Sequence, residues 1–131
     1  MEITSFQFDA NDSLLRITLA GAFSLPEAKA QFVDTVGGIA KHQAKNILID
    51  GRALTGAPIA IERFLYGEFV AKIIAGLGEN GVSRTPRFAY VMVEPVLDRH
   101  RLGEAVATNR GVDVKAFDKL SAAEEWLLAA S

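Results

Sequence analysis

Acidic side chains end three apolar runs of the sequence, and they are the first candidates for chemistry. Asp50, Glu94 and Asp118 each follow a run that is typical of a buried strand. Carboxylates that meet at one sheet edge shift one another's pKa, as general acid–base catalysis requires. Acids at strand ends also cap helices or tie loops. We expect Asp50 to have this structural role, on the loop that follows it, and we expect no catalytic residue.

Neither the histidines nor the possible nucleophiles of the sequence indicate a catalytic or metal site. His42 stands beside a lysine near a predicted helix end, and only His100 and Glu104 have an i, i+4 spacing. Such a pair is more typical of a surface ion pair than of a metal site. The sequence contains no cysteine and no Gly-x-Ser-x-Gly turn, which excludes thiol chemistry, disulfides and a hydrolase elbow. We therefore expect a protein that is not an enzyme and binds no metal.

The segment Gly76-Leu77-Gly78-Glu79-Asn80-Gly81 has the glycine spacing of a dinucleotide-binding loop. That loop needs a strand before it and a helix after it, so that the helix amino terminus meets the phosphates. Here a helix is predicted before the glycines and a strand after them. We expect a helix stop at this segment and no cofactor.

Apolar and basic side chains gather after the predicted strand at 46–50, and they define a candidate surface for a partner or ligand. Its residues are Arg52, Thr55, Ile61, Phe64 and Leu65. The three apolar ones do not follow the stripe of the predicted helix. Either the helix begins later and they belong to the core, or they form an exposed patch for a partner. In a third interpretation, Arg52, Arg63 and Arg110 attract an anion while Phe64 and Leu65 wall a pocket.

Composition sets the class of the molecule. The chain has 131 residues, of which 50% are hydrophobic and 23% charged, and this predicts one globular domain over 1–131. The net charge of −2 does not favour nucleic acid as a partner. The start has no basic region followed by an apolar run, and no stretch approaches the roughly 18 apolar residues of a membrane span. We expect a cytoplasmic protein, of a bacterium, with no transmembrane segment.

Apolar periodicity predicts the elements that position these residues. Strands are expected near 3–8, 14–20, 46–50, 87–93 and 112–117, and helices near 25–43, 57–77, 96–109 and from 121 to the last alanines at 129–130. After a first hairpin the strands and helices alternate, which favours a mostly parallel sheet flanked by helices. The predicted fold is α/β, with a mixed five-stranded sheet, an N-terminal antiparallel hairpin and about four helices.

The pattern resembles the STAS-type proteins, and within them the SpoIIAA-like group. The resemblance lies in the element order and in three segments: Ile47-Leu48-Ile49-Asp50, Val114-Lys115-Ala116-Phe117-Asp118 and Ala122-Ala123-Glu124-Glu125-Trp126-Leu127. It implies a small sheet with helices that binds proteins or, in some relatives, small apolar or nucleotide ligands. Phosphoregulated members carry an Asp-Ser-Ser/Thr-Gly motif where this chain has Leu54-Thr55-Gly56-Ala57-Pro58. No functional serine is carried over, and Thr55 is the nearest hydroxyl.

Two functions follow as expectations. The first is a non-enzymatic interaction or regulatory module that binds a protein partner or itself, as a homodimer. The second is a domain that binds a small apolar or anionic ligand, such as a lipid or nucleotide, at the carboxyl edge of the sheet.

Overall fold

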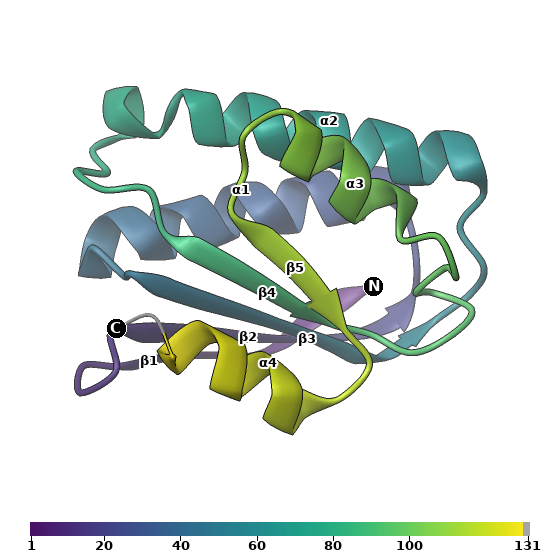
Figure 1. Cartoon of the computed structure of the whole chain (residues 1–131), viewed down its shortest axis with the longest axis horizontal. Helices are drawn as coiled ribbons and strands as arrows, with labels where there is room; N and C mark the ends of the chain where they lie inside the picture. The colour runs from purple at the N-terminus through teal and green to yellow at the C-terminus, as the bar shows by residue number, and fades with distance from the viewer. Residues whose placement is uncertain (130–131) are drawn as a thin grey trace.

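The computed structural model describes residues 1–129, which fold around one twisted sheet (Figure 1). The predicted end of the last helix, at Ala130, lies outside the described residues. In chain order the elements are β1 (Glu2–Asp9), β2 (Leu14–Ala22), α1 (Leu25–His42), β3 (Asn46–Thr55), α2 (Ala60–Ala75), the short 3-10 helix η1 (Leu77–Asn80), β4 (Arg87–Val91), α3 (Leu102–Asn109), β5 (Val114–Phe117) and α4 (Leu120–Leu128). The glycine-spaced segment at 76–81 follows a helix and precedes a strand, as the sequence predicts.

The strands lie in the sheet in their order along the chain, β1-β2-β3-β4-β5. β1 and β2 form an antiparallel hairpin, whereas β2, β3, β4 and β5 are parallel to one another. The predicted α/β class, the five-stranded mixed sheet and the flanking helices are thus confirmed. Because β2, β3, β4 and β5 run in the same direction, their carboxyl ends lie at one edge of the sheet.

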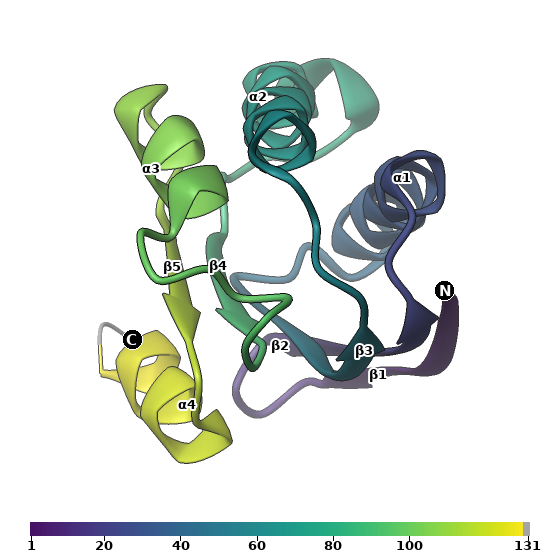
Figure 2. The ribbon, with the colours of Figure 1, turned by 90° about the vertical axis from the view of Figure 1, so that its right-hand side faces the viewer.

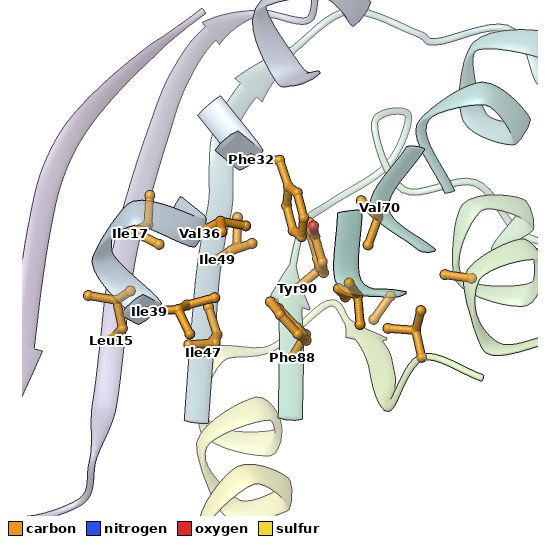
Figure 3. Packing of buried hydrophobic residues seen from close by; sticks show 14 of the residues in the cluster. Leu15, Ile17, Phe32, Val36, Ile39, Ile47, Ile49, Val70, Phe88 and Tyr90 are labelled. Atoms are coloured by element: carbon orange, nitrogen blue, oxygen red, sulfur yellow. The ribbon is translucent and has the colours of Figure 1, made fainter. Parts of the chain in front are cut away.

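Helices cover both faces of this sheet, which explains why the inner strands are apolar throughout. Figure 2 shows α1, α2 and α3 on one face and α4 on the other. Ile17 and Ile49 point to the three-helix face, and Leu14 and Leu48 point to α4. The centre of the larger core is aromatic: the rings of Phe32 on α1 and Phe88 on β4 have centroids 5.9 Å apart (Figure 3).

Strand β3 continues five residues beyond its predicted end. The sequence predicts a loop from Gly51, but β3 pairs with β2 as far as Thr55. The pairing register shifts between Asp50 and Ala53, so a bulge absorbs Gly51 and Arg52. A Cβ on Gly51 would lie 2.8 Å from Cδ1 of Leu54, so a larger residue in this bulge would push the Leu54 side chain aside.

The two helices after β3 and β4 begin later than predicted. Helix α2 begins at Ala60 instead of 57, and the Glu62 carboxylate accepts the Ile59 N–H there at 3.0 Å. Helix α3 begins at Leu102 instead of 96, because the Asp98 carboxylate accepts the Leu102 N–H at 3.1 Å and caps the helix. The guanidinium of Arg63 binds the carbonyl oxygens of residues 95 and 96, so the segment before α3 is held as a loop by α2.

Helices α2 and α3 approach each other closely at one point. Gly67, in the middle of α2, is buried, and a Cβ built on it would lie 2.6 Å from the carbonyl oxygen of Gly103. The same Cβ would lie 3.1 Å from Cβ of Val106. The absence of a side chain at Gly67 therefore sets the distance between these helices.

Candidate functional site

A cavity of about 100 Å³ lies at the carboxyl edge, between the sheet and the three helices on its larger face. Apolar side chains make up most of its wall, among them Leu19, Phe32, Ile49, Leu54 and Met92. The wall draws on both sheet and helices, which places the cavity where open α/β sheets usually bind ligands. The fold and this cavity define an α/β domain with a hollow large enough for a small molecule.

Two tyrosines put a pair of hydroxyl groups into this apolar wall. Tyr66 on α2 and Tyr90 on β4 both line the cavity, and their hydroxyl oxygens are 2.7 Å apart. Burial raises the pKa of Tyr66 to about 12, although the hydrogen bond to Tyr90 acts in the opposite direction. Burial likewise raises the pKa of Tyr90 well above its ordinary value. Both hydroxyls are therefore neutral at physiological pH and act as hydrogen-bonding groups.

Gln31 on α1 contributes the third polar side chain of the wall. Its Nε2 donates to the carbonyl oxygen of Met1 at 3.1 Å, and its Oε1 is buried with no hydrogen-bond partner among residues 1–129. The donation to Met1 fixes which end of the amide is the oxygen, because the reversed amide would set oxygen against oxygen. This oxygen is buried within the packing of the wall and has almost no accessible surface of its own.

Four charged residues stand where the cavity wall meets the surface, and they neutralise one another. Arg63 lies 3.5 Å from Asp98, and Arg101 lies 4.0 Å from Glu104. Arg101 also donates to the Ala116 carbonyl oxygen at 2.8 Å, and Glu104 accepts the Ala116 N–H. Since each of these charges already has a partner in the wall, the cavity presents no free charge to an anion.

The sequence-predicted surface residues lie outside this wall. Arg52 binds the Asp50 carboxylate through Nε and Nη2 at 2.9 and 2.8 Å, and Thr55 is exposed at the end of β3. Ile61 is 54% exposed in the first turn of α2, while Phe64 and Leu65 are half-buried. None of these five residues lines the cavity.

Asp50 has the structural role predicted for it. Burial alone would raise the pKa of its carboxyl, but hydrogen bonds from the side chain and backbone N–H of Arg52 outweigh burial and lower the pKa. Asp50 therefore ties the bulge at 51–52 through its bonds to Arg52. Glu94 and Asp118 are exposed, and no group of three metal-ligating side chains is found among residues 1–129.

The remaining charged candidates have partners of their own. Arg110 lies 3.5 Å from Glu68 and over the Phe64 ring, so it does not join Arg63. The imidazole of His42 stacks on Phe8 with ring centroids 4.4 Å apart. Glu104, spaced i+4 from His100, is used by the backbone of β5. These contacts bring together none of the sequence-predicted anion, metal or catalytic groups.

The two tyrosines of the cavity wall were not found from the sequence, although Arg63 was. In the sequence, the pattern predicts Tyr66 only as an apolar position of a helix, and it predicts Tyr90 only as a residue of a buried strand. One signal was available: the only two tyrosines of the chain fall on two elements expected to pack together. A phenol placed in a core needs a hydrogen-bond partner, and here each tyrosine hydroxyl is the partner of the other.

Comparison of the sequence with protein-family models finds no match, and comparison with curated proteins finds none either. The resemblance to SpoIIAA-like proteins thus stays a prediction. Within the described part of the chain, no helix combines the length and apolar character that crossing a bilayer requires.

Proposed function

We propose that this protein binds a small, neutral, mostly apolar molecule in the cavity at the carboxyl edge. The observation that carries the proposal is the cavity itself, about 100 Å³ with a mainly apolar wall. Protein interiors contain few voids larger than a water molecule. This cavity is partly open to the surface, so a small molecule can enter it.

The nature of the wall selects the ligand class. A single larger side chain at Ala28, which lines the cavity, would fill part of the space, so the void is not forced by the fold. Arg63 and Arg101 are held by carbonyl oxygens and acids, which favours a neutral ligand over an anion. The size is comparable to that of engineered cavities that take up benzene.

Titration with toluene tests this proposal. We expect saturable shifts in the amide NMR signals of residues that line the cavity, and no such shifts with benzoate. Ala28→Leu should abolish toluene binding by occupying its space. Ala30→Leu, two residues along the same helix and exposed, is the matched control and should bind as the wild type does. Absence of toluene binding to the wild-type protein, or unchanged binding to Ala28→Leu, would contradict the proposal.

The second candidate function is an interaction module, and exposed apolar side chains at the start of α2 favour it. Ile59 is 62% exposed and Ile61 is 54% exposed. Burying such side chains against a second copy or another protein is favourable.

Light scattering tests the self-association form of this candidate. We expect a concentration-dependent dimer in the wild type and a monomer in the double variant Ile59→Ser/Ile61→Ser. Val33→Ser removes a side chain that is 51% exposed on α1, and it should leave the dimer intact. A wild-type protein that stays monomeric at every concentration would exclude the homodimer.

A further inference from the structure

The two edge strands of the sheet differ in what covers their outward backbone groups. At the edge formed by β5, Glu104 accepts the Ala116 N–H at 3.1 Å and Arg101 donates to the Ala116 carbonyl oxygen at 2.8 Å. At the other edge, no hydrogen bond to the outward groups of β1 is found among residues 1–129. An exposed strand edge pairs readily with another chain, so native proteins cover or block it. The edge that this chain leaves open is β1.

The side chains of β1 suit pairing with a second copy of the same strand. Phe6 and Phe8 lie on the α1 face of the sheet, and Ser5 and Gln7 lie on the opposite face. Phe6 remains 40% exposed. If two copies pair antiparallel about Phe6, the two Phe6 side chains meet, each Ser5 lies opposite the partner's Gln7, and no like charges lie opposite each other. Cross-strand aromatic pairs stabilise a sheet.

Helix α1 would meet its own copy in such a pairing. It lies over β1 and β2 (Figure 2), since a Cβ built on Gly38 would touch both Phe6 of β1 and Leu15 of β2. With strands about 4.8 Å apart, the two copies of α1 would lie about 10 Å apart, which is the distance at which helices pack. Because Gly38 lies against Phe6, an axis through Phe6 also passes close to Gly38. The two helices are then antiparallel and centred near this glycine.

Two opposite charges without partners stand on the side of α1 that faces the open edge. Gln31 bonds to the Met1 carbonyl oxygen and Gly38 lies against β1. Asp34 follows Gln31 by three residues, and Lys41 follows Gly38 by three, so all four share one side of the helix. Asp34 and Lys41 are exposed, and neither has an ion pair in the described part of the chain.

The positions of these charges match across the axis. Antiparallel helices centred near Gly38 bring Asp34 of each copy beside the partner's Lys41, within one residue along the helix. A two-fold contact contains each such pair twice. Pairing centred on the next residue, Gln7, would move the two charges apart. The charges on α1 therefore favour a second copy as the occupant of this edge, with Phe6 on the axis.

We infer that β1 is the interface of a homodimer, in which two copies pair antiparallel about Phe6 and each Asp34 lies beside the partner's Lys41. The contact joins the two sheets into one continuous sheet and places the two α1 helices side by side. It does not depend on the ligand of the cavity. It also differs from the second candidate function, in which self-association uses Ile59 and Ile61.

Sedimentation equilibrium of charge-reversed variants at low ionic strength tests the inference. The wild type should form a dimer whose population rises with concentration. Asp34→Lys and Lys41→Asp each replace two attractive pairs with two repulsive ones, so each should raise the dimer dissociation constant about tenfold. An equimolar mixture of the two variants places opposite charges together again at both positions. It should form a heterodimer with about the wild-type dissociation constant.

Lys72→Asp is the matched control, because Lys72 is also an exposed lysine in the last turn of its helix, α2. It should leave the dissociation constant unchanged. Hydrogen exchange of the wild type needs no variant: the amides of β1 should exchange more slowly as the protein concentration rises, because the second copy accepts their hydrogen bonds.

The outcomes separate this interface from the alternatives. Weaker dimers of both charge-reversed variants, restored by mixing them, together with slower exchange in β1, support the inference. A wild-type protein that stays monomeric at every concentration overturns it. A dimer that both charge reversals leave unchanged also overturns it, and if Ile59→Ser/Ile61→Ser dissociates that dimer, the contact lies at the start of α2 instead.

Discussion

Replacing Gly67 with valine is expected to lower the free energy of unfolding by about 3 kcal/mol, at the upper end of overpacking costs. The new Cβ would lie 2.6 Å from a backbone oxygen, that of Gly103, which cannot rotate away as a side chain can. Valine would add two methyl groups beside Val106. Helices α2 and α3 would have to separate, and the contact that holds them together would weaken. Urea unfolding followed by circular dichroism measures the change.

Gly37→Ala is the matched control for this substitution. Gly37 also lies inside a helix, α1, but a Cβ built there meets nothing within 4 Å. Because glycine in a helix interior is less stable than alanine by roughly 0.5–1 kcal/mol, Gly37→Ala should stabilise the protein by that amount. The two substitutions thus act in opposite directions. A Gly67→Val protein that unfolds at the wild-type urea concentration would show that α2 and α3 are not in close contact.

Gly67 also illustrates what the sequence could and could not predict. The alternation of apolar runs and amphipathic segments predicts the α/β class and the parallel sheet, because each strand must be covered on both faces. A glycine among the apolar residues of α2 gives no sign of the helix it meets. Its contacts, Gly103 and Val106, lie more than thirty residues further along the chain. Close packing of this kind depends on tertiary structure alone.

The predicted starts of α2 and α3 were wrong for a similar reason. The loop before α3 has apolar residues at helical spacing, which predicts a helix from 96. In the structure the carbonyl oxygens of this loop are bound by Arg63, which belongs to a different helix. The loop therefore satisfies its backbone groups without helical hydrogen bonds. No local pattern contains this information, since it comes from a side chain more than thirty residues away.

The lining of the cavity could not be predicted, although a pocket at the carboxyl edge was expected. The sequence suggested walls of Phe64 and Leu65, which do not line the cavity, whereas Arg63 does. The shape of a cavity results from the summed volumes of side chains on several elements. The pairing of Tyr66 with Tyr90 in its wall depends on the same packing. The sequence did predict the edge of the sheet at which the cavity lies.

Alkaline unfolding gives the second large expected effect, and it acts through the tyrosine pair. In an unfolded chain tyrosine ionises near pH 10, about the value of free tyrosine. Burial raises the pKa of Tyr66 to about 12 and that of Tyr90 above its ordinary value. Above pH 10 or so the native state therefore keeps protons that the unfolded state loses, and the free energy of unfolding falls as pH rises.

For Tyr66 alone, a shift of about two pKa units corresponds to about 3 kcal/mol of stability lost by pH 12 or so. This stability is fully present below about pH 10 and disappears as the pH rises through the folded pKa. The chain has only two tyrosines, so phenolate absorbance reports on this pair and nothing else. We expect no phenolate absorbance in the native protein near pH 10, and a rise that coincides with the loss of circular dichroism.

Tyr66→Phe/Tyr90→Phe separates this effect from the ionisation of lysines in the same range. Removing both partners of a buried hydrogen bond is nearly neutral, whereas removing one leaves a buried hydroxyl unpaired at a cost of about 1 to 3 kcal/mol. The double variant should thus match the wild type at neutral pH and unfold at a higher pH. Tyr66→Phe alone should be less stable than both at neutral pH. Phenolate absorbance that rises near pH 10 while the circular dichroism stays native would mean that the hydroxyls reach solvent and that burial does not protect the pair.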